Sequence, residues 1–220
     1  MYLAAAEKRS DLIIDEPRGR SRCSAKWQDF PHSALAHHAE GCCDVAREWV
    51  LAMDFAQLNG GDLASGPRWM RQKYKWGPTS WPIYWCDAVS RDTLDCGAHA
   101  ALAHEAFTAR GLTSFPAQFV QQYTKDATSQ WLKKWTDDDV SCHWIDDEVI
   151  YHEGVALLID GEEEIKLWDA SAGWWINPRQ QPQGYGSLLA VRVFAKGPFG
   201  GGDGLRWGEH RIQPGVWHEF

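Results

Sequence analysis

The sequence predicts an α+β fold in which helices come first and an antiparallel β-sheet follows. Before residue 111, apolar residues recur at spacings of three and four, which is the period of a helix. After residue 111, the apolar runs are short and rich in β-branched and aromatic residues, as strands are. The two kinds of segment do not alternate, so a parallel sheet built of βαβ units is not expected.

Two helical regions are expected in the first half of the chain. Residues 33–58 carry an apolar stripe at helical spacing and form one helix, or two helices with a break at Gly41. The second region begins at Asp95, a residue type that caps helix N-termini, and runs to Arg110. Cys96 therefore falls in the first turn of this helix.

Four strand-like runs follow, at residues 115–123, 149–159, 164–168 and 188–194. Asp160-Gly161 lies between the second and third runs and suits a tight hairpin turn. A hairpin centred there pairs residues whose numbers add up to about 321. This register predicts that His152 lies opposite Asp169 on the neighbouring strand.

The chain is expected to have three parts. Residues 1–30 mix charge, glycine and proline with little periodicity, which predicts a loop-rich N-terminal arm. Residues 31–195 contain the predicted helices and strands and form the main domain, a size that one hydrophobic core supports. Residues 196–220 are rich in glycine, which loses the most backbone freedom on folding, and predict a flexible or irregular tail.

Composition excludes several classes of function. A net charge of −8 and a pI of about 5.5 argue against a basic groove for nucleic acid. No stretch approaches the roughly 18 apolar residues of a membrane helix, and the N-terminus lacks the pattern of a secretion signal. A cytoplasmic protein without membrane partners is expected. Its six cysteines are too few for a disulfide scaffold of this length, so free thiols are expected.

Cys96 has the local setting of a reactive thiol. The N-terminus of a helix combines the positive end of the helix dipole with unpaired backbone N–H groups, and both favour a thiolate. Gly97 permits close approach of the backbone, and the Cys96 N–H could donate to an oxyanion formed on an attacked carbonyl. A cysteine in a helix is more often a small buried apolar residue, so the position needs support from elsewhere in the chain.

His152 and Asp169 supply that support. Neighbouring antiparallel strands bring the two side chains together in the predicted register. A carboxylate beside an imidazole fixes its tautomer and turns the other ring nitrogen toward a nucleophile. We therefore predict Cys96 as nucleophile, His152 as its base and Asp169 as the residue that orients the base.

The order of these motifs resembles the transglutaminase-like superfamily within the papain-like cysteine enzymes. In that superfamily a cysteine opens a helix, a histidine lies on a strand and an aspartate lies on the next strand. Asp95-Cys96-Gly97 resembles the nucleophile motif, and Asp169-Ala170 resembles the aspartate motif. The matched region runs from about residue 81 to residue 171. The resemblance implies a papain-like arrangement of helices on an antiparallel sheet, with residues 31–195 as the catalytic domain.

The resemblance also implies acyl chemistry. The cysteine attacks an amide or ester of a peptide, protein or small molecule, and water or an amine acceptor resolves the thioester. An upstream Trp or Gln often assists the oxyanion in this superfamily, which makes Trp85 a candidate. Trp81 and Trp174 lie near the motifs and are candidate walls of the substrate cleft. The histidine motif departs from the family, since Glu153 stands where an aromatic residue often follows His152.

Other interpretations are weaker. His37-His38 and Cys42-Cys43 offer zinc-binding atoms, but adjacent side chains point to different sides of a helix, so no metal is expected. No oxygen-rich loop suits calcium, and no cofactor is expected. In a second interpretation, the Trp-rich loops form a non-catalytic peptide or small-molecule binding module and Cys96 is inert. A third, a peptidase-like toxin or effector, shares the triad and differs only in its substrate.

Overall fold

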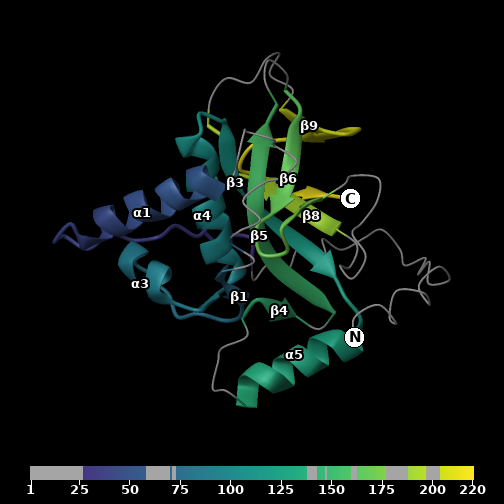
Figure 1. Ribbon diagram of the computed structural model, residues 1–220. Coiled ribbons are helices and arrows are strands. Elements are labelled where there is room, and N and C mark those ends of the chain that lie inside the picture. The colour runs from purple at the N-terminus through teal and green to yellow at the C-terminus, as the bar shows by residue number, and fades with distance from the viewer. Residues whose placement is uncertain are drawn as a thin grey trace.

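A computed structural model describes most of the chain. The described residues are 27–57, 70, 73–137, 143–146, 148–159, 163–176, 188–196 and 204–220. Within them the protein has the predicted α+β architecture, with helices gathered beside one large antiparallel sheet (Figure 1).

Helices lie beside the sheet on one side and at one end (Figure 1). They are α1 (Cys42–Gln57), α3 (Trp85–Ser90), α4 (Cys96–Ala109) and α5 (Lys125–Asp137). The helix α4 packs directly on strands β3 and β5 of the sheet, and α1 packs on both α3 and α4. Among the described residues, none of the helices has the length and apolar character needed to cross a lipid bilayer.

The main sheet has seven strands in the order β11-β8-β3-β5-β6-β7, with β4 paired to β5. They are β3 (Ser114–Gln122), β4 (Ile145–Asp146), β5 (Val149–Leu158), β6 (Ile165–Asp169), β7 (Trp174–Ile176), β8 (Leu188–Val193) and β11 (His218–Glu219). Two small sheets accompany it. They pair β1 (Lys75–Trp76) with β2 (Thr93–Leu94), and β9 (Leu205–Trp207) with β10 (His210–Ile212).

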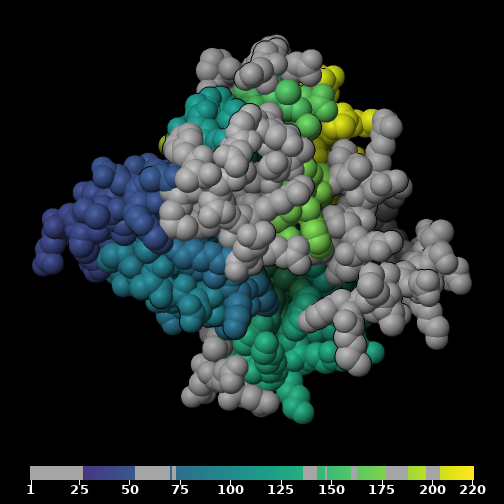
Figure 2. All heavy atoms as spheres, in the orientation of Figure 1, coloured from purple at the N-terminus to yellow at the C-terminus, as the bar shows by residue number. Residues whose placement is uncertain are grey.

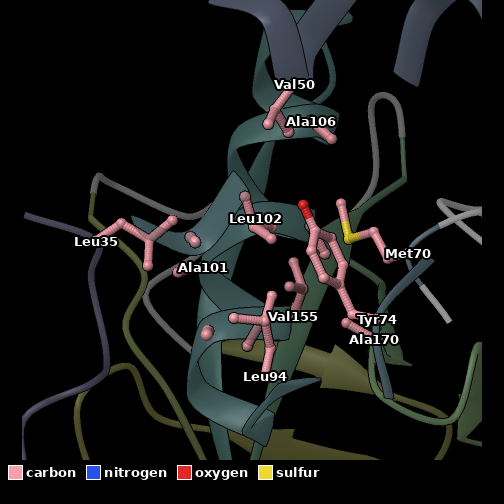
Figure 3. Close-up of a cluster of buried hydrophobic side chains, with 14 of the residues drawn as sticks. Leu35, Val50, Met70, Tyr74, Leu94, Ala101, Leu102, Ala106, Val155 and Ala170 are labelled. Carbon is pink, nitrogen blue, oxygen red and sulfur yellow. The ribbon is translucent and has the colours of Figure 1, made fainter. Parts of the chain in front are cut away.

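The sheet is covered on both faces. On one face, Leu102 of α4 packs with Leu94, Val155 and Tyr74 in the cluster drawn in Figure 3. On the other face, a second buried cluster joins strands of the main sheet to β9 and β10. Its members include Phe119, Leu167, Val193, Leu205 and Ile212. Because successive residues of a strand face opposite sides, β5 gives Val155 to the first cluster and Ala156 to the second.

The predicted elements agree with the structure at most positions. Strands β3, β5, β6 and β8 fall on the four predicted runs, and α4 begins at Cys96 as Asp95 predicted. The first helix begins only at Cys42, after Gly41, which has a φ of 77°. Residues 33–41 are therefore not helical, and the positive φ explains why the helix cannot extend back through Gly41.

The register of β5 on β6 differs from the predicted one by two residues. Val155 pairs with Trp168 and Leu158 with Ile165. Continued by one pair, this ladder sets Asp169 level with Gly154, so His152 is not its directly opposite partner. Asp160-Gly161, on which the predicted register depended, lies outside the described residues.

The two ends of the described chain are built into the fold. Trp27 is fully buried and its indole N–H donates to the carbonyl of His143 over 3.1 Å. Residues 204–220, expected to be irregular, form β9, β10 and β11, because Leu205 and Ile212 fill the second face of the sheet. The rest of the predicted arm, residues 1–26, and the glycine-rich residues 197–203 lie outside the described residues.

Candidate active site

Cys96 is the first residue of α4 and is partly exposed. The Asp95 carboxylate caps the helix by accepting a hydrogen bond from the backbone N–H of Ala98 over 2.8 Å. This cap fixes the start of the helix at Cys96, so the thiol lies at the positive end of the helix dipole.

His152, on β5, is held by a buried carboxylate. Its Nε2 lies 2.9 Å from Oδ2 of Asp169, which is fully buried at the end of β6. The other carboxylate oxygen, Oδ1, accepts hydrogen bonds from the Ser171 hydroxyl at 2.9 Å and from the Ala172 N–H at 3.0 Å. With both oxygens engaged, Asp169 has a fixed orientation and in turn fixes the imidazole.

The Cys96 thiol and the His152 imidazole interact through a hydrogen bond and through their charges. Because Nε2 of His152 is turned to Asp169, Nδ1 is the nitrogen left for the thiol. The structure thus brings together the three residues that the sequence analysis selected from α4, β5 and β6.

The electrostatics of the three groups differ. Burial raises the pKa of the Cys96 thiol, and the adjacent His152 opposes that rise. Burial also opposes charge on His152, but Asp169 and Cys96 hold the pKa of its imidazole well above the usual range. Burial acts against charge on Asp169 too, yet His152 and the two hydrogen bonds to Oδ1 bring its pKa below the ordinary carboxyl value. The arrangement favours a proton on His152 and a charge on Asp169.

Trp81 lies against the start of α4, where Gly97 is the second residue. The Trp81 indole N–H donates to Oδ2 of Asp95 over 2.7 Å, and the Thr79 hydroxyl donates to the same oxygen over 2.6 Å. A Cβ on Gly97 would come within 3.2 Å of the Trp81 ring and 2.8 Å of Cβ of Ser33. Gly97 therefore permits two segments to close on the helix start, and the Trp81 N–H is engaged by Asp95.

The other two predicted accessory residues, Trp85 and Trp174, differ in their position relative to the site. Trp85 is buried in α3, with its ring 6.2 Å from that of His37 and 5.9 Å from the guanidinium of Arg47. These contacts place it against α1 and give no support to the predicted oxyanion role. Trp174 pairs with Asp169 across the β6–β7 ladder and is partly exposed, so it lies beside the acid of the site.

Sequence reasoning did not assign a role to Glu153, which is buried next to His152. Its carboxylate accepts hydrogen bonds from the Ser33 N–H at 3.0 Å, the Ser33 hydroxyl at 3.1 Å and the Tyr151 hydroxyl. Burial raises the pKa of Glu153, and its negative charge contributes to the raised pKa of Cys96. The signal in the sequence was an acidic residue inside an apolar strand, a position that requires hydrogen-bonding partners.

His99, one turn along α4 from Cys96, is fully buried. Its Nδ1 lies 2.8 Å from the carbonyl oxygen of Asp95, and its ring meets Tyr74 edge to face. Burial lowers the pKa of His99, so its neutral form is favoured and Nδ1 donates to that carbonyl. These contacts give His99 a structural role at the start of α4.

No protein-family model, curated protein or solved structure matches this chain.

Proposed function

We propose that this protein is a cysteine-dependent acyl-transfer enzyme of the transglutaminase-like, papain-like type. Cys96 is the nucleophile, His152 its general base and Asp169 the residue that positions the base. One observation carries the proposal: the thiol at the start of α4 contacts an imidazole whose Nε2 is held by a buried carboxylate. Nucleophile, base and orienting acid in this order are the parts that covalent acyl transfer needs.

The reaction follows from these roles. His152 takes the thiol proton before attack, and the Cys96 thiolate then forms a bond to the carbonyl carbon of an amide or ester. The carbonyl oxygen becomes an oxyanion, for which the N-terminal N–H groups of α4 provide positive potential. When the carbon–nitrogen or carbon–oxygen bond breaks, His152 returns the proton to the leaving amine or alcohol and a thioester remains on Cys96. Water or a second amine then attacks the thioester, and the released sulfur recovers a proton.

The surroundings of Cys96 support a carbonyl substrate that enters from solvent. Cys96 is partly exposed, and Trp81, which lies against the neighbouring Gly97, is 39% exposed, so both residues reach the surface at the start of α4. The acyl donor in this proposal is a peptide, protein or small molecule, and the acceptor is water or an amine. A reducing compartment would keep Cys96 as a thiol, so the proposal includes a cytoplasmic location.

The decisive experiment follows acylation of Cys96 directly. The wild-type chain is mixed with p-nitrophenyl acetate, nitrophenolate release is recorded, and the acetyl group is located by peptide mass spectrometry. We expect turnover by the wild-type chain, with an acetyl thioester on Cys96 that is absent in Cys96→Ala. The rate of nitrophenolate release should fall at least about a hundredfold in His152→Ala. His210→Ala, a histidine change in β10, is the matched control and should behave as wild type.

The same measurement distinguishes the alternative of a non-catalytic binding module. In a binding module Cys96 is an ordinary thiol, so acetylation would be slow, would not turn over and would be equal in wild type and His152→Ala. That result would contradict the proposed enzymatic activity and favour the binding module formed by the Trp-rich loops.

A further inference from the structure

Three cysteines and one histidine meet where α1 and α3 pack together. His38 precedes α1, Cys42 and Cys43 open that helix, and Cys86 is the second residue of α3. The ligand atoms of His38, Cys43 and Cys86 all lie within 4.8 Å of one another. Sγ of Cys86 lies 3.2 Å from Sγ of Cys43 and 3.7 Å from Sγ of Cys42.

These separations suit a single tetrahedral ion. A zinc ion about 2.3 Å from each sulfur and about 2.0 Å from an imidazole nitrogen sets neighbouring ligand atoms roughly 3.5–3.8 Å apart. The Cys42–Cys86 separation of 3.7 Å already has this value, and the Cys43–Cys86 separation of 3.2 Å needs to open by a few tenths of an ångström. His38, Cys43 and Cys86 therefore fit one ion with small movements. Cys42, whose sulfur is near that of Cys86 alone in these separations, must turn toward the other two to supply the fourth ligand.

The surrounding contacts prepare the cluster. The backbone N–H of His38 donates to Sγ of Cys43 over 3.4 Å, the type of contact that stabilises a metal-bound thiolate. The His38 ring stacks on Tyr84 with centroids 3.7 Å apart, which holds the imidazole against the start of α3. The segment before α1 is also tied there by hydrogen bonds from the Ala36 N–H to Ile83 and from the Trp85 N–H to Ala36.

The sequence did not predict this site because His38, Cys42 and Cys43 are close together in the sequence, whereas Cys86 is distant from them. His37-His38 with Cys42-Cys43 cannot all face one ion, and the structure turns His37 away, with its Nδ1 3.2 Å from a carboxylate oxygen of Asp44. In place of His37, the structure brings Cys86 of α3 to the start of α1.

We propose that His38, Cys42, Cys43 and Cys86 form a structural zinc site that fastens α1 to α3. Thiolate and imidazole donors favour zinc over magnesium or calcium, and four protein ligands leave no open position for a substrate. The two helices form one flank of the molecule, at the left in Figures 1 and 2. The proposal shares no residue with the Cys96 site, so it stands or fails independently of the proposed function.

The test measures zinc in the full-length chain. Protein purified without chelators is incubated with zinc sulfate and desalted, and the metal is measured by inductively coupled plasma mass spectrometry. We expect about one zinc per chain, retained in Cys96→Ser and lost in Cys86→Ser. Wild-type protein that retains no zinc, or Cys86→Ser protein that retains as much as wild type, would overturn the proposal.

Cobalt(II) gives a readout that does not require replacement of the buried Cys43 or the partly buried Cys86. Cobalt added to the metal-free wild-type chain should produce thiolate charge-transfer absorption and the visible bands of tetrahedral geometry. Cys42→Ser, a change at an exposed position, should fold and should weaken the charge-transfer absorption by roughly a third, since one of three thiolates is removed. Equal spectra in wild type and Cys42→Ser would contradict the assigned ligand set.

The short Cys43–Cys86 separation also has a competing explanation in a disulfide. Intact mass spectrometry of the unreduced protein decides between the two. A mass lower by two hydrogens, with both cysteines protected from alkylation until a reductant is added, would overturn the zinc site.

Discussion

The Asp169 carboxylate lies 2.9 Å from Nε2 of His152, although the two residues are not directly opposite each other on β5 and β6. The ladder sets Asp169 level with Gly154, so the contact runs diagonally, between positions two residues apart on one strand. Diagonal neighbours are within reach of side chains as long as these. The interaction therefore depends on side-chain direction and on the hydrogen bonds that fix Asp169.

Replacing Asp169 by Asn should slow the reaction of Cys96 with iodoacetamide at neutral pH. The amide keeps a similar shape but removes the negative charge that raises the pKa of His152. The protonated imidazole, which stabilises the neighbouring thiolate, is then less favoured. We expect a decrease on the order of tenfold or more, measured by peptide mass spectrometry. Ser171→Ala removes a hydrogen bond to the same carboxylate but keeps its charge, and should have a smaller effect. Equal rates in wild type and Asp169→Asn would contradict the role of the carboxylate.

Asp169 should also stabilise the fold in a pH-dependent way. Its pKa is lower in the folded protein than in the unfolded chain, despite burial, because His152 and two hydrogen bonds favour its charged form. This contribution is fully present above the unfolded carboxyl pKa of about 4 and is lost as the pH falls through the folded value. Urea unfolding of wild type and Asp169→Asn should therefore differ most near neutral pH, with a difference that shrinks in acid. Asp146→Asn, at an exposed position in β4, is the control for the change from carboxylate to amide.

Glu153→Gln should lower the pKa of the Cys96 thiol. The Glu153 charge is one of the causes that raise this pKa, so its removal favours the thiolate and moves the pH midpoint of Cys96 alkylation downward. Tyr151→Phe removes a hydrogen bond that favours the charged form of Glu153, so it should move the midpoint in the same direction by a smaller amount. An unchanged or higher midpoint in Glu153→Gln would show that the charge does not reach the thiol.

Gly97→Ala should destabilise the protein through Ser33. The added Cβ would come within 2.8 Å of Cβ of Ser33, so the segment that carries Ser33 must move. Overpacking of this kind costs about 1–3 kcal/mol of the free energy of unfolding. In a Ser33→Gly background the same change should cost less, because both the Cβ and the hydroxyl of Ser33 are gone. Equal costs in the two backgrounds, measured by chemical denaturation, would place the strain elsewhere.

Arg192→Met should destabilise the docking of the residues that begin the described chain. The buried guanidinium donates to Oε1 of Gln118 and to the carbonyls of Gln28 and Phe30. Its loss removes these hydrogen bonds, although the Phe30 carbonyl keeps a second donor in Nε2 of Gln118. We expect a loss of about 3 kcal/mol. Arg206→Met breaks a pair with Glu164 at an exposed position and should cost less than about 1 kcal/mol. Similar losses in both variants would argue against the buried network.

The parts of the site that could be predicted are those set by local chemistry. Asp95 followed by Cys96 predicts a capped helix that begins at the thiol, and the structure has this cap. The apolar runs predict β5 and β6 because β-branched and aromatic residues favour strands. With the strands in place, His152 and Asp169 had to come near each other, even though the predicted register was displaced by two residues.

The remainder depends on contacts between distant segments. Ser33 reaches Glu153 across 120 positions of sequence, and Cys86 reaches Cys43 across 43 positions. No local pattern predicts either contact. The helix α5 was not predicted either. Its buried Trp135 packs with Ile145 and Ile150 from β4 and β5. The helix is therefore stabilised by packing against the sheet, which the local sequence does not show.

The two residues of β11 have a consequence for how the chain can be shortened. They pair with Val191 and Ala190 and so cover the outer hydrogen-bonding edge of β8, an apolar strand that contains two valines and two leucines. A chain cut after residue 195 would expose this edge to other molecules. Unprotected edges of this composition template intermolecular pairing, so such a fragment should aggregate even if its helix side folds correctly.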